Sequence, residues 1–171
     1  MIHRSVFLAL FAFTLAPSAF AQESSPEQFQ EMLEAWEGRW NGSGTDEDGN
    51  EMVAIADCRI AGDGTTLICN SYMGEESGIW FIVYDRAAKR IRSQWGQSDG
   101  EAAHAIIFKD GKDWVQKGTG STPDGKKTEY THRISISNNG NTHEWKRTRQ
   151  VDGATQTSGD TWQRLSSRRA Q

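Results

Sequence analysis

The fold is decided by residues 127–165, KTEYTHRISISNNGNTHEWKRTRQVDGATQTSGDTWQRL. Polar and apolar side chains alternate over three segments of this stretch, and the dipeptides Asn139-Gly140 and Asp152-Gly153 separate the segments. Such dipeptides are typical of two-residue β-hairpin turns, and alternation is typical of strands with one buried face. The stretch therefore predicts three consecutive antiparallel strands.

The turn at Asn139-Gly140 fixes which residues lie opposite one another in the first hairpin. We expect Tyr130 opposite Arg149, His132 opposite Arg147 and Ile134 opposite Trp145. The other face of the hairpin is polar throughout and must lie outside. The inner face then carries the aromatic and basic side chains that are the candidate ligand-binding residues: Tyr130, His132, Trp145, Arg147 and Arg149.

Two arginines that point into a barrel need water or a partner, because an unpaired buried charge is costly. The turn at 152–153 places Asp160 on the same inner face, one diagonal from Arg147, so a structural ion pair is one interpretation. The other is a cavity in which Arg147, Arg149 and Tyr130 hold the carboxylate of a ligand, since a guanidinium forms two hydrogen bonds with such a group. The residues leave both interpretations open.

Short strands separated by Gly, Asp and Asn turns continue through the rest of the chain from Trp40 onward. The expected strands cover residues 39–46, 51–60, 65–73, 78–85, 89–96, 102–109, 112–119, 127–137, 141–151 and 155–165. The pairs Asp63-Gly64 and Asp110-Gly111 are further hairpin turns. A meander of this length is expected to close, because closure removes its two unpaired edges. The sequence thus predicts an all-β fold, an antiparallel up-and-down meander of about ten strands closed into a β-barrel, with one short N-terminal helix.

The helix is expected directly before the first strand. Ser25 is a suitable N-cap, Pro26 fits the first helical position, Gln28 fits the capping box and Gly38 can end the helix. Its apolar residues form one stripe: Phe29, Met32, Leu33 and Trp36. We expect this stripe to cover the barrel core as a lid.

The two cysteines flank the turn at Asp63-Gly64. A two-residue turn there puts Cys58 directly opposite Cys69, within reach of a disulfide. The position is a hydrogen-bonded pair, the less usual site for a cross-strand disulfide, so two small buried thiols are the alternative. Small side chains on the inner face of this hairpin also leave space inside the barrel.

Residues 1–21 have the parts of a cleaved secretory signal peptide: Arg4 near the start, an apolar run over 7–15, and Ala19-Phe20-Ala21 at the cleavage site. No segment reaches the roughly 20 apolar residues of a transmembrane helix. We expect residues 22–171 to form a single domain in the periplasm or outside the cell. Loss of Arg4 leaves 18 Lys and Arg against 23 Asp and Glu, and a net charge of −5 argues against nucleic acid as a partner. No feature indicates an oligomeric state.

The junction of helix and first strand reads Gly38-Arg39-Trp40-Asn41-Gly42-Ser43-Gly44, a G-x-W-x-G-x-G string. It resembles the first strand of the calycins, which include lipocalins, fatty-acid-binding proteins and nitrobindin-type barrels. Residues 79–95, IWFIVYDRAAKRIRSQW, resemble a bacterial lipocalin-like family of unknown function. The order of the helix and strands resembles these families over residues 22–171, whereas the resemblance in amino-acid sequence is limited to these two stretches.

This resemblance implies roles for several residues. In lipocalins a basic residue of the last strand packs over the G-x-W tryptophan, which implies that Arg164 closes one barrel end over Trp40. Fatty-acid-binding proteins hold a carboxylate with an interior Arg-Tyr cluster, which agrees with the carboxylate interpretation above. Nitrobindin-type barrels bind haem through a histidine near the C-terminal strands, but the flanks of His132 and His143 do not match a haem motif, so no cofactor is expected.

The sequence has no HExxH or CxxC motif and no phosphate-binding loop. His132, Asp160 and Tyr130 are capable of acid–base chemistry, but no recognisable nucleophile accompanies them. The sequence favours a barrel that binds a small amphipathic, anionic molecule without a metal. The alternatives are a structural or protein-interaction barrel of the cell envelope with a filled core, and an enzyme on a barrel scaffold.

Overall fold

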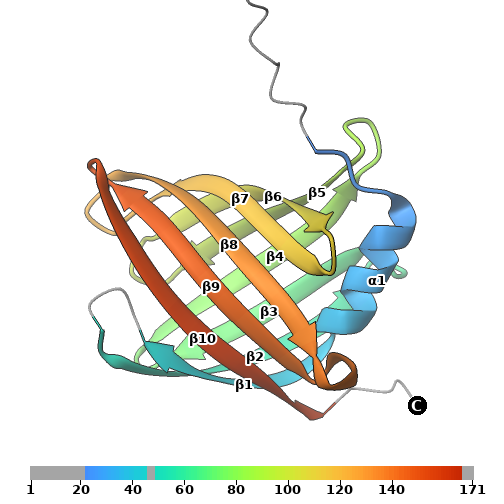
Figure 1. Cartoon of the computed structure of the whole chain (residues 1–171), viewed down its shortest axis with the longest axis horizontal. Helices are drawn as coiled ribbons and strands as arrows, with labels where there is room; N and C mark the ends of the chain where they lie inside the picture. Colours follow the sequence, from blue (N-terminus) through green and yellow to red (C-terminus); the bar gives the residue numbers. More distant parts are fainter. Residues whose placement is uncertain (1–21, 46–48, 167–171) are drawn as a thin grey trace, which may run out of the picture.

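Ten antiparallel strands close into a barrel, and one helix precedes them (Figure 1). The computed structural model describes residues 22–45 and 49–166, so the predicted signal peptide, residues 1–21, lies outside the described residues. The elements are α1 (Pro26–Trp36), β1 (Gly38–Thr45), β2 (Glu51–Ala61), β3 (Thr66–Met73), β4 (Glu76–Asp85), β5 (Arg90–Gln97), β6 (Ala102–Asp110), β7 (Asp113–Ser121), β8 (Lys127–Ser137), η1 (Asn138–Gly140), β9 (Thr142–Val151) and β10 (Ala154–Ser166). Each strand pairs with the next, and β1 pairs with β10. The predicted meander barrel is confirmed.

The registers of the β8–β9 and β9–β10 hairpins agree with those predicted from the turns. Tyr130 pairs with Arg149 and His132 with Arg147, while on the next hairpin Trp145 pairs with Asp160. Because side chains alternate between the two faces of a strand, this register turns the predicted set of aromatic and basic residues into the barrel.

Two of the predicted two-residue turns are longer loops. Residues 62–65 form a four-residue loop, and residues 138–141 form another that includes the 3₁₀ turn η1. Both loops are centred on the predicted dipeptides, so each adds one residue to either side and the register is unchanged. At the third site the turn lies one residue later than predicted: Asp110 pairs with Asp113, which places Gly111, with a φ of 63°, at the first central position.

The helix α1 begins and packs as its sequence predicts. The Ser25 hydroxyl accepts a hydrogen bond from the Gln28 backbone, and the Gln28 side chain accepts one from the Ser25 backbone, which forms the capping box. All four residues of the apolar stripe are buried. In the described part of the chain, no helix is long and apolar enough to cross a membrane.

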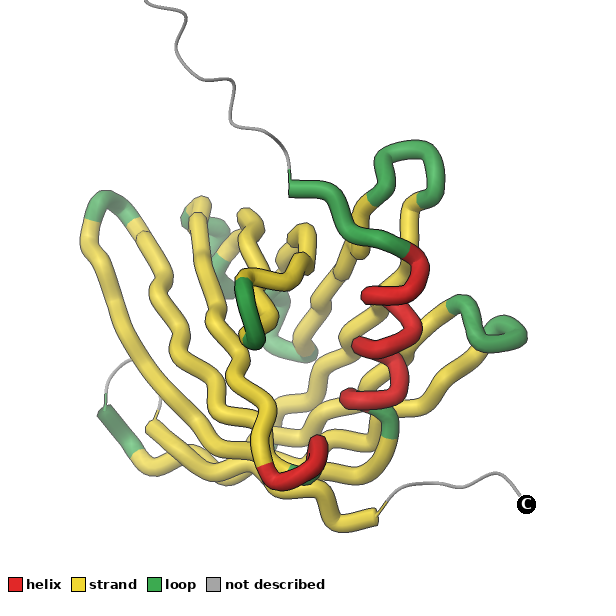
Figure 2. The backbone as a smooth tube through the Cα atoms, turned by 45° about the vertical axis from the view of Figure 1, so that its right-hand side comes forward, coloured by secondary structure: helices red, strands yellow, loops and turns green. Residues whose placement is uncertain are grey.

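The helix lies across one end of the barrel (Figure 2). Next to the helix, large aliphatic side chains fill the core: Met32, Leu33, Leu67, Ile82, Ile91, Ile107 and Ile134. Elsewhere in the barrel, inward positions around the cavity hold smaller or polar residues, among them Ala56, Ser71, Gln116 and Tyr130. The barrel is therefore solid beneath α1 and hollow toward its other end.

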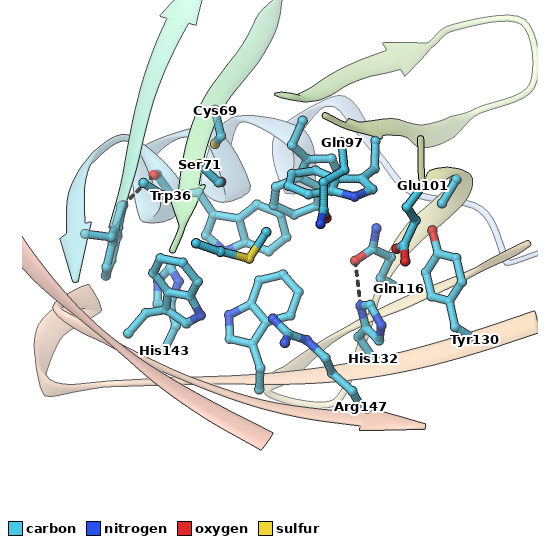
Figure 3. A pocket seen from close by; sticks show the side chains of 18 of the residues that line it. Trp36, Cys69, Ser71, Gln97, Glu101, Gln116, Tyr130, His132, His143 and Arg147 are labelled. Carbon is cyan, nitrogen blue, oxygen red and sulfur yellow. Dashed lines mark hydrogen bonds between the residues drawn. The ribbon is translucent and has the colours of Figure 1, made fainter. Parts of the chain in front are cut away.

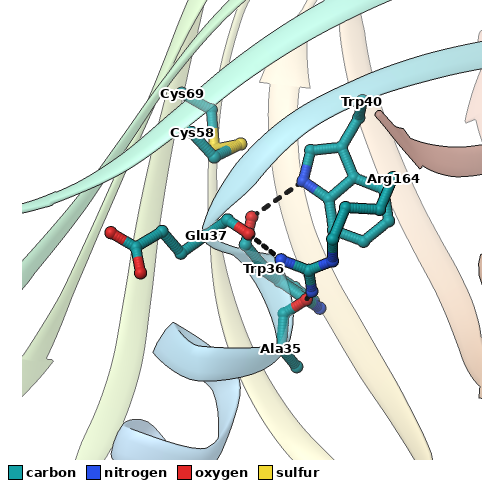
Figure 4. The surroundings of a disulfide bond; sticks show 7 residues. All are labelled: Ala35, Trp36, Glu37, Trp40, Cys58, Cys69 and Arg164. Carbon is teal, nitrogen blue, oxygen red and sulfur yellow. Dashed lines mark hydrogen bonds between the residues drawn. A yellow bond between two sulfur atoms is a disulfide. The ribbon is translucent and has the colours of Figure 1, made fainter. Parts of the chain in front are cut away.

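A disulfide and an arginine hold the surroundings of the helix C-terminus (Figure 4). Cys58 and Cys69 pair directly and are bonded, as predicted. Arg164 of β10 lies over Trp40, with 4.4 Å between its Cζ atom and the ring centroid. Its guanidinium donates hydrogen bonds to the carbonyls of Glu37, Ala35 and Gly140, the last at 3.0 Å. One side chain thus ties β10 to the end of α1 and to the β8–β9 turn.

Candidate ligand-binding cavity

A cavity of about 240 Å³ lies inside the barrel (Figure 3). The five candidate residues from the sequence line it: Tyr130, His132, Trp145, Arg147 and Arg149. The rest of the wall comes from α1, from all ten strands and from the turn before β6: Trp36, Trp40, Ala56, Cys58, Cys69, Ser71, Met73, Trp80, Trp95, Gln97, Glu101, Ala103, Gln116, Thr128, His143 and Trp162. The lining is apolar on the side of α1 and polar toward Glu101 and Tyr130 (Figure 3).

Three indoles form the apolar part of the wall. The rings of Trp36 and Trp80 are stacked with centroids 4.9 Å apart, and Trp145 lies 6.0 Å from Trp36 and 5.8 Å from Trp80. Indoles in mutual contact hold one another in place and present large flat surfaces. The wall therefore suits a flat apolar molecule.

Arg147 is paired with the most buried carboxylate of the site. Its Nη2 donates to Oδ2 of Asp160 over 3.0 Å, and the indole N–H of Trp162 donates to the same oxygen. The Asp160 side chain is completely buried. Burial raises the pKa of Asp160, whereas Arg147 and Trp162 oppose that rise. The ion pair that the sequence left as one of two interpretations is present in the structure.

Arg149 is paired with Glu101, a residue that the sequence pattern does not place in the site. The two charges are 3.0 Å apart, between Nη2 and Oε2, and the side chains are 15% and 25% exposed. Figure 3 shows the Tyr130 hydroxyl on the same side of the cavity as Glu101. Burial, reinforced by the Glu101 carboxylate, raises the pKa of Tyr130 to about 12 although Arg149 opposes it, so the phenol stays protonated.

A short hydrogen-bond chain fixes the proton of His132. Nε2 of Gln116 donates to the Ser93 hydroxyl over 3.1 Å, which turns Oε1 of Gln116 toward Nδ1 of His132 at 3.2 Å. An amide oxygen only accepts, so Nδ1 carries the proton and Nε2 keeps its lone pair. Burial, aided by Arg147 and Arg149, lowers the pKa of His132 to about 3, and the ring is neutral.

His143 differs from His132 because it is packed among aromatic rings. It is 4% exposed, and its ring centroid lies 4.1 Å from that of Trp40 and 6.3 Å from that of Trp36. Burial, aided by Arg164, lowers its pKa to about 3, and its Nε2 is enclosed without a hydrogen-bond partner among the described residues. Residues 22–45 and 49–166 contain no group of three or more His, Cys, Asp or Glu side chains that would hold a metal.

Several polar residues of the cavity were not predicted from the sequence, among them Gln116 and Glu101. The sequence does indicate that Gln116 points inward, because it follows the inward residue Trp114 by two positions on the same strand. Glu101 has no such signal, because it lies in a turn before β6, where alternation does not apply. Its role appears only when the barrel brings that turn to Arg149, 48 residues away in the chain.

No protein family model matches the chain, and no curated protein matches it. Among solved structures, Rv2717c from M. tuberculosis matches with a TM-score of 0.56 and 13% identity, over 84% of this chain and 100% of that chain. EF1p2_mFAP2b bound to DFHBI matches with a TM-score of 0.43 and 16% identity, over 80% and 99%. The redesigned β-barrel b11L5F_LGL matches with a TM-score of 0.41 and 13% identity, over 78% and 95%. The likeness to Rv2717c is one of fold alone.

Proposed function

We propose that this protein binds a small, flat, amphipathic molecule inside its barrel. The observation that carries the proposal is the cavity, which has an indole wall at one side and a cluster of hydrogen-bonding side chains at the other. Ligand sites in proteins are typically apolar cavities with a few well-placed polar groups. The apolar body of the ligand lies against Trp36, Trp80 and Trp145. Its head group faces Arg147, Arg149, Tyr130 and His132.

The charge of that head group depends on residues that the sequence pattern does not place in the cavity. The arginines alone predict an anionic head group. The structure adds a carboxylate beside each arginine, Asp160 at Arg147 and Glu101 at Arg149. The preferred charge of the ligand therefore depends on how far these carboxylates neutralise the arginines.

The interaction alternative requires a filled core together with an exposed apolar surface. Such a surface is present on the outer face of β2, β3 and β4, where Val53 is 64%, Tyr72 57% and Ile79 55% exposed. The core is not filled, since the cavity lies within it. A hollow interior with hydrogen-bonding groups at one side suits ligand binding, whereas the structural alternative predicts a filled core, which favours the binding function.

Export to an oxidising compartment belongs to the same proposal. The disulfide between Cys58 and Cys69 supports it, because such bonds persist outside the reducing cytosol. Intact-mass measurement of the protein from a bacterial periplasm tests it. A chain that begins at Gln22 and is two hydrogens lighter than its reduced form is expected; a chain that keeps residues 1–21 contradicts export.

Native mass spectrometry of the purified protein tests the binding function. We expect an additional small mass in the native spectrum that disappears when the protein is denatured. Addition of the fluorescent probe N-phenylnaphthylamine covers the case of a natural ligand lost during purification. A bare polypeptide that also fails to bind this probe would show that the barrel does not take small apolar molecules.

Two neighbouring alanines offer a matched pair of variants for this measurement. Ala103 lines the cavity, whereas Ala102 is exposed on the outer face of the same strand. Ala103→Phe fills the cavity and should abolish probe binding. Ala102→Phe adds the same side chain outside and should leave binding unchanged. Equal binding by both variants would place the probe outside the barrel and contradict the proposal.

A further inference from the structure

The charges inside the cavity balance. The charged residues that line it are Arg147, Arg149 and Glu101, and Asp160 is in direct contact with Arg147. Both nitrogen–oxygen distances of the ion pairs are 3.0 Å. A ligand carboxylate would bring a third negative charge to two cations that already have partners, and burial makes such an excess charge costly. The interior therefore offers an anion no net attraction.

The hydrogen-bonding groups of the cavity include an acceptor that a carboxylate cannot use. His132 donates through Nδ1 to Gln116, so its Nε2 lone pair is left as an acceptor on a residue of the cavity wall. An ionised carboxylate has no proton to donate to this nitrogen. A hydroxyl or a primary amide donates to it and accepts a hydrogen bond at the same time.

Donors for the acceptor half of such a group lie next to His132. Arg147 is its direct cross-strand partner, and the hydrogen bond to Asp160 engages Nη2 of a guanidinium that has five N–H groups. Tyr130 lies on the other side, with its ring centroid 4.7 Å from that of His132, and its phenol is protonated. Donors and an acceptor therefore converge on one part of the wall.

We propose that the cavity selects an uncharged, flat molecule whose head group both donates and accepts a hydrogen bond, such as a primary amide or a hydroxyl, in preference to the corresponding carboxylate. This inference rests on the proposed function and names the ligand class of the same site. This uncharged head group differs from the anionic one that the arginines alone suggest, because the Glu101 carboxylate neutralises Arg149.

Three naphthalene probes that differ only in the head group test the inference: the carboxamide, the methyl ester and the carboxylate. By titration calorimetry at neutral pH, the carboxamide should bind most tightly, the ester less tightly and the carboxylate most weakly. The Kd of the carboxylate should be about tenfold higher than that of the carboxamide, which corresponds to the free energy of one unmatched polar contact. A carboxylate that binds as tightly as the carboxamide overturns the inference. Binding of N-phenylnaphthylamine without binding of the carboxamide overturns it as well and leaves the proposed function standing. If none of the four molecules binds, the proposed function itself fails.

Glu101→Gln tests the charge balance directly, because it keeps the shape of the side chain and removes one negative charge. In this variant the affinity for the carboxylate probe should rise about tenfold relative to the affinity for the carboxamide probe. Glu129→Gln, on the exposed outer face of β8, is the matched control and should leave the ratio unchanged. His132→Phe removes the acceptor and should abolish the advantage of the carboxamide over the ester. If the ratio of carboxylate to carboxamide affinity in Glu101→Gln equals that of the wild type, the role assigned to the ion pairs is contradicted. The ranking of the three probes by the wild-type protein decides the inference even if a variant does not fold.

Discussion

Arg149 of β9 and Glu101, which directly precedes β6, are 3.0 Å apart although β7 and β8 lie between their strands in the barrel. The ion pair therefore crosses the interior instead of running along the sheet. Both side chains are largely shielded from water, at 15% and 25% exposure. The pair connects two walls of the cavity, so it should affect stability as well as ligand choice.

A double-mutant cycle on this pair should reveal a favourable coupling. Each single change, Arg149→Met or Glu101→Gln, removes one charge of the pair and keeps the other shielded charge, whereas the double variant removes both. We expect a coupling energy of roughly 1–3 kcal/mol from urea unfolding, as for contacting charges that are partly buried. High salt should reduce the coupling only in part because the pair is shielded. Additive effects of the two substitutions would mean that the contact does not contribute to stability.

Removal of the disulfide should destabilise the barrel and leave its fold intact. Cys58 and Cys69 are 11 residues apart. A bond that closes so short a loop lowers the conformational entropy of the unfolded chain, which stabilises the folded protein by about 2–3 kcal/mol. The free energy of unfolding should fall by that amount in the double variant Cys58→Ala, Cys69→Ala. A reducing agent should destabilise the wild type similarly and have no effect on the double variant. Equal stability of wild type and variant in urea unfolding contradicts this prediction.

Most of the fold follows from local rules that the sequence obeys. The dipeptides Asn139-Gly140 and Asp152-Gly153 centre their turns, and turn position fixes the register of the flanking strands. The register in turn decides which side chains point inward, so the inward face with Tyr130, His132 and Arg147 could be predicted from the sequence. The disulfide follows from the same argument at Asp63-Gly64.

The partners of the inward residues could be predicted less well, because they come from distant parts of the chain. Asp160 was within reach of prediction since it lies on the strand next to Arg147. Glu101 was not, because its contact depends on how the barrel closes and on the path of a turn. This difference changes the chemical interpretation: arginines without partners suggest an anionic ligand, whereas paired arginines suggest an uncharged one.

Replacement of Arg164 should weaken the attachment of α1 to the barrel. Arg164→Met removes hydrogen bonds to three backbone carbonyls and the contact with Trp40, so a loss of about 2 kcal/mol or more is expected in urea unfolding. Arg164→Lys should recover only part, since lysine lacks the planar fork that reaches several acceptors. Arg92→Met removes an exposed ion pair with Asp85 and serves as the control, with a change below about 1 kcal/mol. A larger loss in the control than in Arg164→Met contradicts the role given to Arg164.

The stability of the barrel should fall steeply as the pH drops below 6. Burial lowers the pKa of both His132 and His143 from 6.5 to about 3 in the folded protein. Between these values the unfolded chain takes up protons that the folded protein does not, so acid favours unfolding. Each histidine contributes about 1.4 kcal/mol per pH unit, and the two together roughly 2–3 kcal/mol per pH unit. Asp160 acts in the opposite sense, because its raised pKa lets the folded protein take up a proton before the unfolded chain does.

Urea unfolding at a series of pH values between 7 and 4 checks this expectation. His132→Gln and His143→Gln should each reduce the slope of unfolding free energy against pH by about half, because each removes one of the two protons bound on unfolding. His104→Gln changes a histidine on the exposed outer face of β6 and should leave the slope as it is in the wild type. A slope that persists in the variant lacking both His132 and His143 would mean that carboxylates, and not the buried histidines, determine the acid sensitivity of the barrel.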